Sequence, residues 1–154
     1  MSQPNIEESR GGRTLTSDPA RMDVSAIHRY LSQESYWARG IPLDLVARSL
    51  ANSLCFGIFD GPAQVAFARV VSDRATFAWL CDVYVLESYR RRGLARWLLD
   101  AIDRHPDLQG LRRWSLATRD AHPLYARVGY APMAHPDRHM ERTVVDAYTG
   151  GRTR

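Results

Sequence analysis

The stretch YVLESYRRRGLARWLLDAI, residues 84–102, decides the fold and raises the first question about function. It begins as an apolar strand, and from Leu94 onward its apolar side chains recur at the spacing of an amphipathic helix. Three consecutive arginines and Gly93 stand at the predicted start of that helix, where unpaired N–H groups and the helix dipole already present positive charge. A bound anion would relieve this crowding, so the junction is a candidate phosphate site. The alternative is a solvated basic turn that pairs with Glu87 or Asp100.

The remaining pattern predicts a mixed α/β (α+β) fold, with part of the sheet parallel across the helix after the arginines. An Asp60-Gly61 turn joins two of the strands as a hairpin. In chain order the predicted elements are helix 22–33, helix 42–52, strand 53–59, strand 64–71, strand 76–86, helix 94–104, strand 112–118, helix 120–129 and one or two edge strands within 130–144.

The length of 154 residues fits one domain, predicted over residues 13–145 between a flexible N-terminal arm (1–12) and a frayed tail (146–154). No apolar run approaches the roughly 20 residues of a membrane span. The first residues lack a signal-peptide pattern, so the expected location is cytoplasmic, without a membrane partner.

All 21 basic residues are arginine, and the net charge of +4 permits an anionic ligand without requiring nucleic acid. Basic residues interleaved with aromatic ones, as in RNA-binding sheets, are absent, which excludes nucleic acid as the expected partner. The glycine-rich fingerprints of Rossmann and P-loop nucleotide sites are absent as well.

The cysteines and histidines do not indicate a metal site. Cys55 and Cys81 each lie in an apolar run and are expected to be buried free thiols. His135 and His139 have helical spacing, but Pro136 stands between them. No metal is expected.

The run Arg90-x-x-Gly93-x-Ala95 resembles the acetyl-CoA signature [QR]-x-x-G-x-[GA] of the GCN5-related N-acetyltransferases, the GNAT superfamily. The order of the predicted elements over roughly residues 14–144 is similar to the family's. The resemblance implies a GNAT-like fold, in which about four helices flank a mixed, mostly antiparallel sheet that splays at the cofactor strand. Arg91 departs from the family, which often has glycine there, and makes the loop bulkier and more cationic.

The resemblance further implies acetyl-CoA as cosubstrate, with its pyrophosphate on the loop amides and its pantetheine arm along the strand before the loop. The implied cofactor-binding residues are Val83, Tyr84, Val85, Arg90, Arg91, Arg92, Gly93, Leu94, Ala95 and Arg96.

The family's proton donor for the CoA thiolate is a tyrosine in a context similar to LYARVGY, which implies that role for Tyr125. A tyrosine that only packs in the core is the alternative. Asp82 and His122 are the candidate bases, and an amine that arrives neutral would need neither. The family's usual polariser of the thioester carbonyl is a backbone N–H, here near Val83.

The expected activity is N-acetylation of an amine of a small molecule or peptide by direct attack, in a monomer or homodimer. Four aromatic residues could wall the amine pocket, although aromatic residues at such places also serve as core. They are Tyr36, Trp37, Phe56 and Trp79. The alternative function is a non-catalytic module that binds or senses acetyl-CoA.

Overall fold

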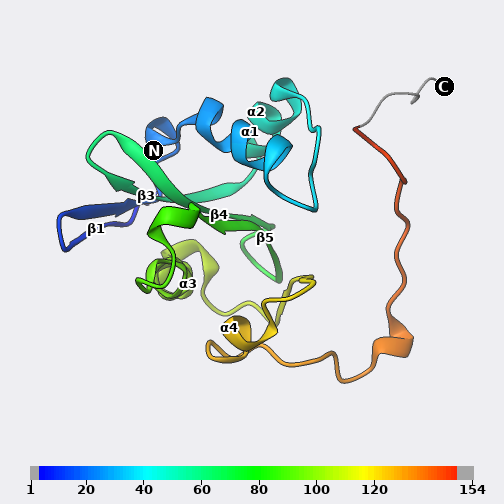
Figure 1. The fold of residues 1–154 in the computed structure, drawn as a ribbon. Coiled ribbons are helices and arrows are strands. Elements are labelled where there is room, and N and C mark those ends of the chain that lie inside the picture. Colours follow the sequence, from blue (N-terminus) through cyan, green and yellow to red (C-terminus); the bar gives the residue numbers. More distant parts are fainter. Residues whose placement is uncertain (1–3, 149–154) are drawn as a thin grey trace.

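The computed structural model of the chain describes residues 4–148, and its centre is a six-stranded sheet whose strands lie in sequence order (Figure 1). The strands are β1 (Glu7–Arg10), β2 (Arg13–Thr16), β3 (Leu54–Asp60), β4 (Ala63–Ser72), β5 (Phe77–Val85) and β6 (Arg113–Ser115). Neighbouring strands are antiparallel except β5 and β6, which are parallel. The predicted mixed, mostly antiparallel sheet is confirmed.

Helices cover both faces of this sheet (Figure 1). On one face lie α1 (Val24–Gln33) and α2 (Leu43–Ala51), over a core that includes Phe67 and Tyr84. On the other lies α3 (Leu94–Arg104), and α4 (His122–Ala126) follows β6. Single 3-10 turns occur at Pro19–Arg21, Glu87–Tyr89, Pro106–Leu108 and Pro136–Arg138.

The helix after the arginines forms as its pattern predicts. Its apolar stripe, which includes Leu98, Ala101 and Ile102, is almost completely buried against the sheet. Gly93 precedes it with φ +77°, a left-handed conformation that glycine adopts without a steric cost. Since parallel strands need a crossover, α3 is what allows β6 to lie parallel to β5.

The N-terminus differs from the prediction. Residues 7–10, expected within a flexible arm, form β1 and pair with β2 across a turn at Gly11-Gly12, where φ is +56° and +79°. The Glu8 carboxylate accepts a 2.8 Å hydrogen bond from Trp97 Nε1 and forms an ion pair with Arg104. Both partners lie on α3, so β1 is held against this helix. The glycine pair was the available signal for this hairpin.

The C-terminal part also differs. No strand forms after β6 among the described residues, and the predicted edge strands within 130–144 are absent. The helix predicted over residues 120–129 is shorter, since α4 begins after Ala121 and ends at Ala126. Residues 145–148 form a turn, and the rest of the predicted tail lies outside the described residues.

Both cysteines are free thiols, and burial raises the pKa of each to about 12. Within residues 4–148 no three histidine, cysteine or carboxylate side chains gather as metal ligands would. In the same part of the chain, no helix is long and apolar enough to cross a membrane.

Candidate active site

The sheet opens between β5 and β6. The two strands pair only over Phe77–Trp79, and beyond that point no described strand pairs with β5 on the β6 side. On the β4 side, Asp82 and Val83 together stand opposite Ala68, so β5 carries a bulge. Asp82 has φ +55° in this bulge, a conformation that aspartate tolerates better than most residues. The diverging strands leave a V-shaped opening with an exposed strand edge.

The arginine loop lies at the mouth of this opening, beside a cavity of about 810 Å³. No side chain caps α3, and its first backbone hydrogen bond runs from the Trp97 N–H to the Gly93 carbonyl at 3.0 Å. The N–H groups of residues 91–96 therefore have no acceptor among the described residues. A Cβ built on Gly93 would meet nothing within 4 Å, so the loop surface is open there. Unpaired amides at a helix N-terminus are a binding site for an anion.

The three arginines have three different environments. Arg90 donates from Nε to the Val85 carbonyl at 2.9 Å and from Nη2 to the Tyr30 hydroxyl at 3.1 Å, so it ties the loop to β5 and α1. The Arg92 guanidinium lies over the ring of Tyr89, and Arg92 does not line the cavity. This differs from the predicted contact of its side chain with the cofactor phosphates and leaves only its backbone N–H in the loop. Arg91 lines the cavity and has no partner among the described residues. Of the three loop arginines, Arg91 is therefore the one whose guanidinium is available to an anion.

Every other predicted cofactor residue lines the same cavity: Val83, Tyr84, Val85, Arg90, Arg91, Gly93, Leu94, Ala95 and Arg96. The sequence did not indicate the three further arginines of the lining, Arg39, Arg119 and Arg127. Two acidic residues, Glu34 and Asp120, are also present, so the wall is predominantly cationic.

Tyr125 lies on α4 and lines the large cavity together with two smaller ones, each of about 390 Å³. Burial raises the pKa of Tyr125 to about 12, so its hydroxyl is protonated at neutral pH. The hydroxyl makes no hydrogen bond to any of the described residues. It is therefore a protonated donor without a partner where the cavities meet.

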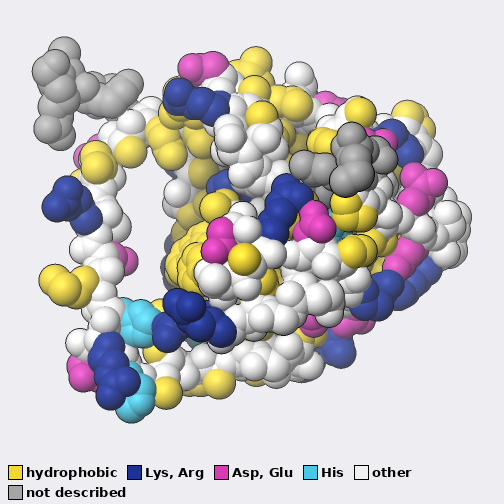
Figure 2. Space-filling view, turned by 180° about the vertical axis from the view of Figure 1, so that it is seen from behind, with side chains coloured by type: hydrophobic (Ala, Val, Ile, Leu, Met, Phe, Trp, Pro, Cys, Tyr) yellow, Lys and Arg dark blue, Asp and Glu magenta, His cyan; other side chains and the backbone are white. Residues whose placement is uncertain are grey.

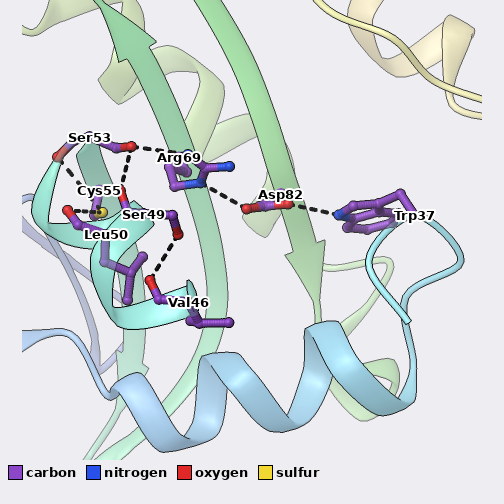
Figure 3. Close-up of polar contacts among 8 residues, drawn as sticks. All are labelled: Trp37, Val46, Ser49, Leu50, Ser53, Cys55, Arg69 and Asp82. Carbon is purple, nitrogen blue, oxygen red and sulfur yellow. Dashed lines mark hydrogen bonds and ion pairs between the residues drawn. The ribbon is translucent and has the colours of Figure 1, made fainter. Parts of the chain in front are cut away.

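Asp82 holds the loop between α1 and α2 (Figure 3). Its Oδ1 accepts from Trp37 Nε1 and its Oδ2 from Arg69 Nε, each at 2.8 Å. Arg69 also donates to the Ser53 hydroxyl at 3.0 Å, which continues the chain of contacts towards α2. Although burial opposes the charge of Arg69, the Asp82 carboxylate keeps its pKa above the usual value. Each carboxylate oxygen thus already accepts a hydrogen bond, one of them from a cation, so both oxygens of Asp82 are engaged in holding this loop.

Three of the four predicted aromatic residues meet at the second cavity, which shares part of its lining with the large one. Tyr36, Trp37 and Trp79 line it, and the Tyr36 hydroxyl accepts a 2.8 Å hydrogen bond from the Arg119 N–H. The prediction for Phe56 is wrong, because its side chain is 0% exposed in the core under α3. Strand alternation sends it to the other face of the sheet.

His122 is not brought to either of these cavities. It is exposed at the start of α4 and lines only the third cavity, which lies beside β6. Sequence reasoning missed Arg69 and Arg119, the residues that fix Asp82 and Tyr36. Their partners stand 13 and 83 positions away, so no local pattern could have revealed the contacts.

Known proteins resemble the chain in sequence and in fold. The sequence model of one protein family, the acetyltransferase (GNAT) domain, matches residues 51–132 of the chain. A curated Gibberella zeae protein, provisionally named an acetyltransferase, is 33% identical in an alignment 114 residues long. The alignment covers 62% of this chain and 64% of that protein, so it spans less than two thirds of the relative.

Two solved structures extend the comparison. One from Xanthomonas campestris pv. campestris, provisionally described as a GNAT acetyltransferase, is 52% identical with a TM-score of 0.88, covering 92% of this chain and 99% of the other. A similarly described acetyltransferase from Deinococcus radiodurans R1 shares the fold at 16% identity, with a TM-score of 0.71 and coverage of 93% and 96%.

Proposed function

This chain belongs to the GNAT acetyltransferases, and from this membership we propose that it is an enzyme that transfers the acetyl group of acetyl-CoA to an amine nitrogen. The acceptor is a small molecule or a peptide. One observation carries the proposal: the unpaired amides around Gly93 and the unpartnered hydroxyl of Tyr125 line the same cavity. An anion site next to a proton donor is what a CoA thioester requires.

The residues present fit the cosubstrate. The amides of residues 91–96 and the Arg91 guanidinium would hold the pyrophosphate, and the open face of Gly93 lets it approach the backbone. The free edge of β5 at Val83–Val85 would pair with the amide groups of the pantetheine arm, as an added strand does.

The proposed reaction needs two groups of the protein, a donor to the acetyl oxygen and a proton donor to the leaving thiolate. The amine attacks the acetyl carbon directly, a C–N bond forms as the C–S bond breaks, and the nitrogen loses a proton to solvent. A backbone N–H near Val83 stabilises the oxyanion that develops on the acetyl oxygen. Tyr125 supplies the proton that the leaving thiolate takes up, and solvent restores the phenol.

The second cavity would receive the amine. Its aromatic wall of Tyr36, Trp37 and Trp79 suits an apolar or cationic group next to the reacting nitrogen. Asp82 is assigned to holding Trp37 in that wall rather than to proton abstraction, because Arg69 already binds its carboxylate. The amine therefore reacts in its neutral form.

The test is a single-turnover assay that follows thiol release from acetyl-CoA over a panel of primary amines and peptides. We expect release with at least one class of amine, and a loss of roughly 10²–10⁴-fold in the Tyr125→Phe variant. Since the hydroxyl has no protein partner, this variant should keep its fold and its affinity for CoA. Tyr130→Phe, on the neighbouring ring, is the matched control.

The outcomes separate an enzyme from a binding module. A protein that binds CoA but releases no thiol with any amine is a non-catalytic acetyl-CoA module. Undiminished turnover in Tyr125→Phe would remove this residue from the chemistry and leave a site that acts by positioning alone.

A further inference from the structure

After α4 the chain leaves the sheet instead of returning to it. Residues 131–146 are all exposed, and residues 139–148, the C-terminal arm, stand away from the body in both views (Figures 1 and 2). The arm touches the rest of the chain near its two ends. There Arg113 lies 3.5 Å from His139, and the Tyr148 carbonyl lies beside Gly40. An open gap separates its middle from the body (Figure 2).

The middle of the arm has the composition of a buried strand. Three apolar side chains of the arm are the most exposed large apolar side chains among residues 4–148: Met140 at 99%, Val144 at 64% and Val145 at 82%. The β-branched run Thr143-Val144-Val145 favours a strand. The sequence pattern predicted a strand here, and among the described residues this segment pairs with no strand of its own chain.

The sheet offers an unpaired edge of the matching kind. β6 is the last strand, and among the described residues nothing pairs with its outer side. β1, at the opposite edge, carries Glu7, Glu8 and Arg10, and such charges discourage further pairing. The outer edge of β6 continues from Trp114 through Ala117 without a charge. This edge is therefore open to another strand.

Beside that edge lies a groove, the third cavity of about 390 Å³. One wall is non-helical backbone at residues 114–118, the other is non-helical backbone at residues 130–133, and α4 completes the lining. Trp114, Leu116 and Met133 make much of its surface apolar. A groove with an unpaired strand on one wall and an apolar lining has the form that an added β-strand occupies.

We propose that two copies of the chain form a dimer by exchanging their arms, so that residues 140–145 of each copy lie in the groove of the other and pair with its β6. A two-fold axis makes the exchange reciprocal, and both exposed surfaces of both copies are covered at once. The chain's own arm turns away at Pro136–Arg138 and ends near Gly40, which leaves its own groove free for the second copy. The exchanged strand packs on α4, next to the ring of Tyr125.

The first test is the molar mass in solution, measured by light scattering after size exclusion. We expect twice the 17.5 kDa of one chain for the wild type and a single chain for Val144→Asp/Val145→Asp. Val144→Ile/Val145→Ile, which keeps apolar β-branched side chains, should remain a dimer. Leu43→Asp places the same charge on an exposed apolar residue of α2 and should also remain a dimer. Far-UV circular dichroism checks that each variant is folded.

The second test is tryptic cleavage after Arg142, which needs no variant. The bond should be protected in the wild type and cut rapidly in the double aspartate variant. A monomer that is cut at Arg142 would show that the arm has no partner, and a monomer that is protected there would show that the arm folds into its own groove. A dimer that is cut at Arg142 uses another interface. Each of these three results overturns the proposal.

Discussion

Replacing Gly93 tests whether the arginine loop binds an anion through its backbone. Asparagine and aspartate are nearly the same size and are the side chains that best tolerate φ near +77°. Either substitution costs about 1 kcal/mol of stability in strain, and neither Cβ meets an atom within 4 Å. Gly93→Asn and Gly93→Asp therefore differ chiefly by one negative charge at the proposed phosphate site.

The expected size of that difference follows from Coulomb's law. A carboxylate 4–8 Å from a phosphate, at an effective dielectric constant of about 20, opposes binding by about 2–4 kcal/mol, which weakens affinity roughly 30- to 700-fold. CoA at about 100 times its Kd should stabilise the wild type by about 2.7 kcal/mol, or roughly 5–11 °C in Tm for a chain of this length. At the same concentration Gly93→Asp should shift by no more than about 3 °C, and by almost nothing at the upper end of that loss of affinity.

The assay is thermal unfolding with increasing CoA, which needs no knowledge of the amine. Gly93→Asn should keep most of the wild-type shift, and each variant is compared with its own melting temperature without ligand. A Gly93→Asp protein that keeps the full shift would refute anion binding at this loop. Equal losses in both variants would show that bulk, rather than charge, is what the loop excludes.

Two further predictions concern the loop between α1 and α2 and the pH dependence of stability. Trp37→Phe removes the hydrogen bond to Asp82 and should raise KM for the amine several-fold in steady-state kinetics. Although Trp37 lines both the large and the second cavity, the CoA shift should stay near the wild-type value, because phenylalanine keeps an aromatic ring there. Trp79→Phe, which lines only the second cavity and lacks that bond, is the control, and a CoA shift that changes with KM would contradict a role of the bond in the amine site alone. The hydrogen bond from Arg104 holds the pKa of Glu8 below its ordinary value of 4.5. The ionised Glu8 therefore stabilises the fold fully above pH 4.5, and this stabilisation is lost as the pH falls through the lower pKa of the folded state. Unfolding temperatures between pH 7 and 3 should therefore fall less in Glu8→Gln than in the wild type or in the more exposed Glu7→Gln, and identical slopes would contradict this linkage.

The elements that position the loop were predictable because their signals are local. The apolar stripe of α3 repeats every three to four residues, and Gly93 stands next to it in the chain. The Asp60-Gly61 hairpin and the crossover to a parallel strand follow from equally short patterns. The Gly11-Gly12 turn carried a comparable signal, but the polar residues around it concealed the strand β1.

The roles of individual side chains were less predictable because they depend on contacts across the fold. Three neighbouring arginines look equivalent in the sequence, yet Arg90 is tied to Tyr30, 60 positions earlier, and Arg92 lies over the Tyr89 ring and does not line the cavity. Phe56 differs from the aromatic residues of the pocket only in the face of the sheet to which its strand sends it. Arg69 matters because folding brings it to Asp82.

The sequence by itself determined the mixed sheet, the helix after the arginines and the glycine loop at its start, since these follow from the order and spacing of neighbouring residues. Only the tertiary structure decided that Asp82 is bound to Arg69 and Trp37, that Tyr125 is half-buried with no hydrogen-bond partner for its hydroxyl among the described residues, and that residues 140–145 pair with no described strand of their own chain. The physical reason is that burial, charge pairing and strand pairing depend on which residues meet in space. Residues that are far apart along the chain give no local sequence pattern from which such a contact could be predicted.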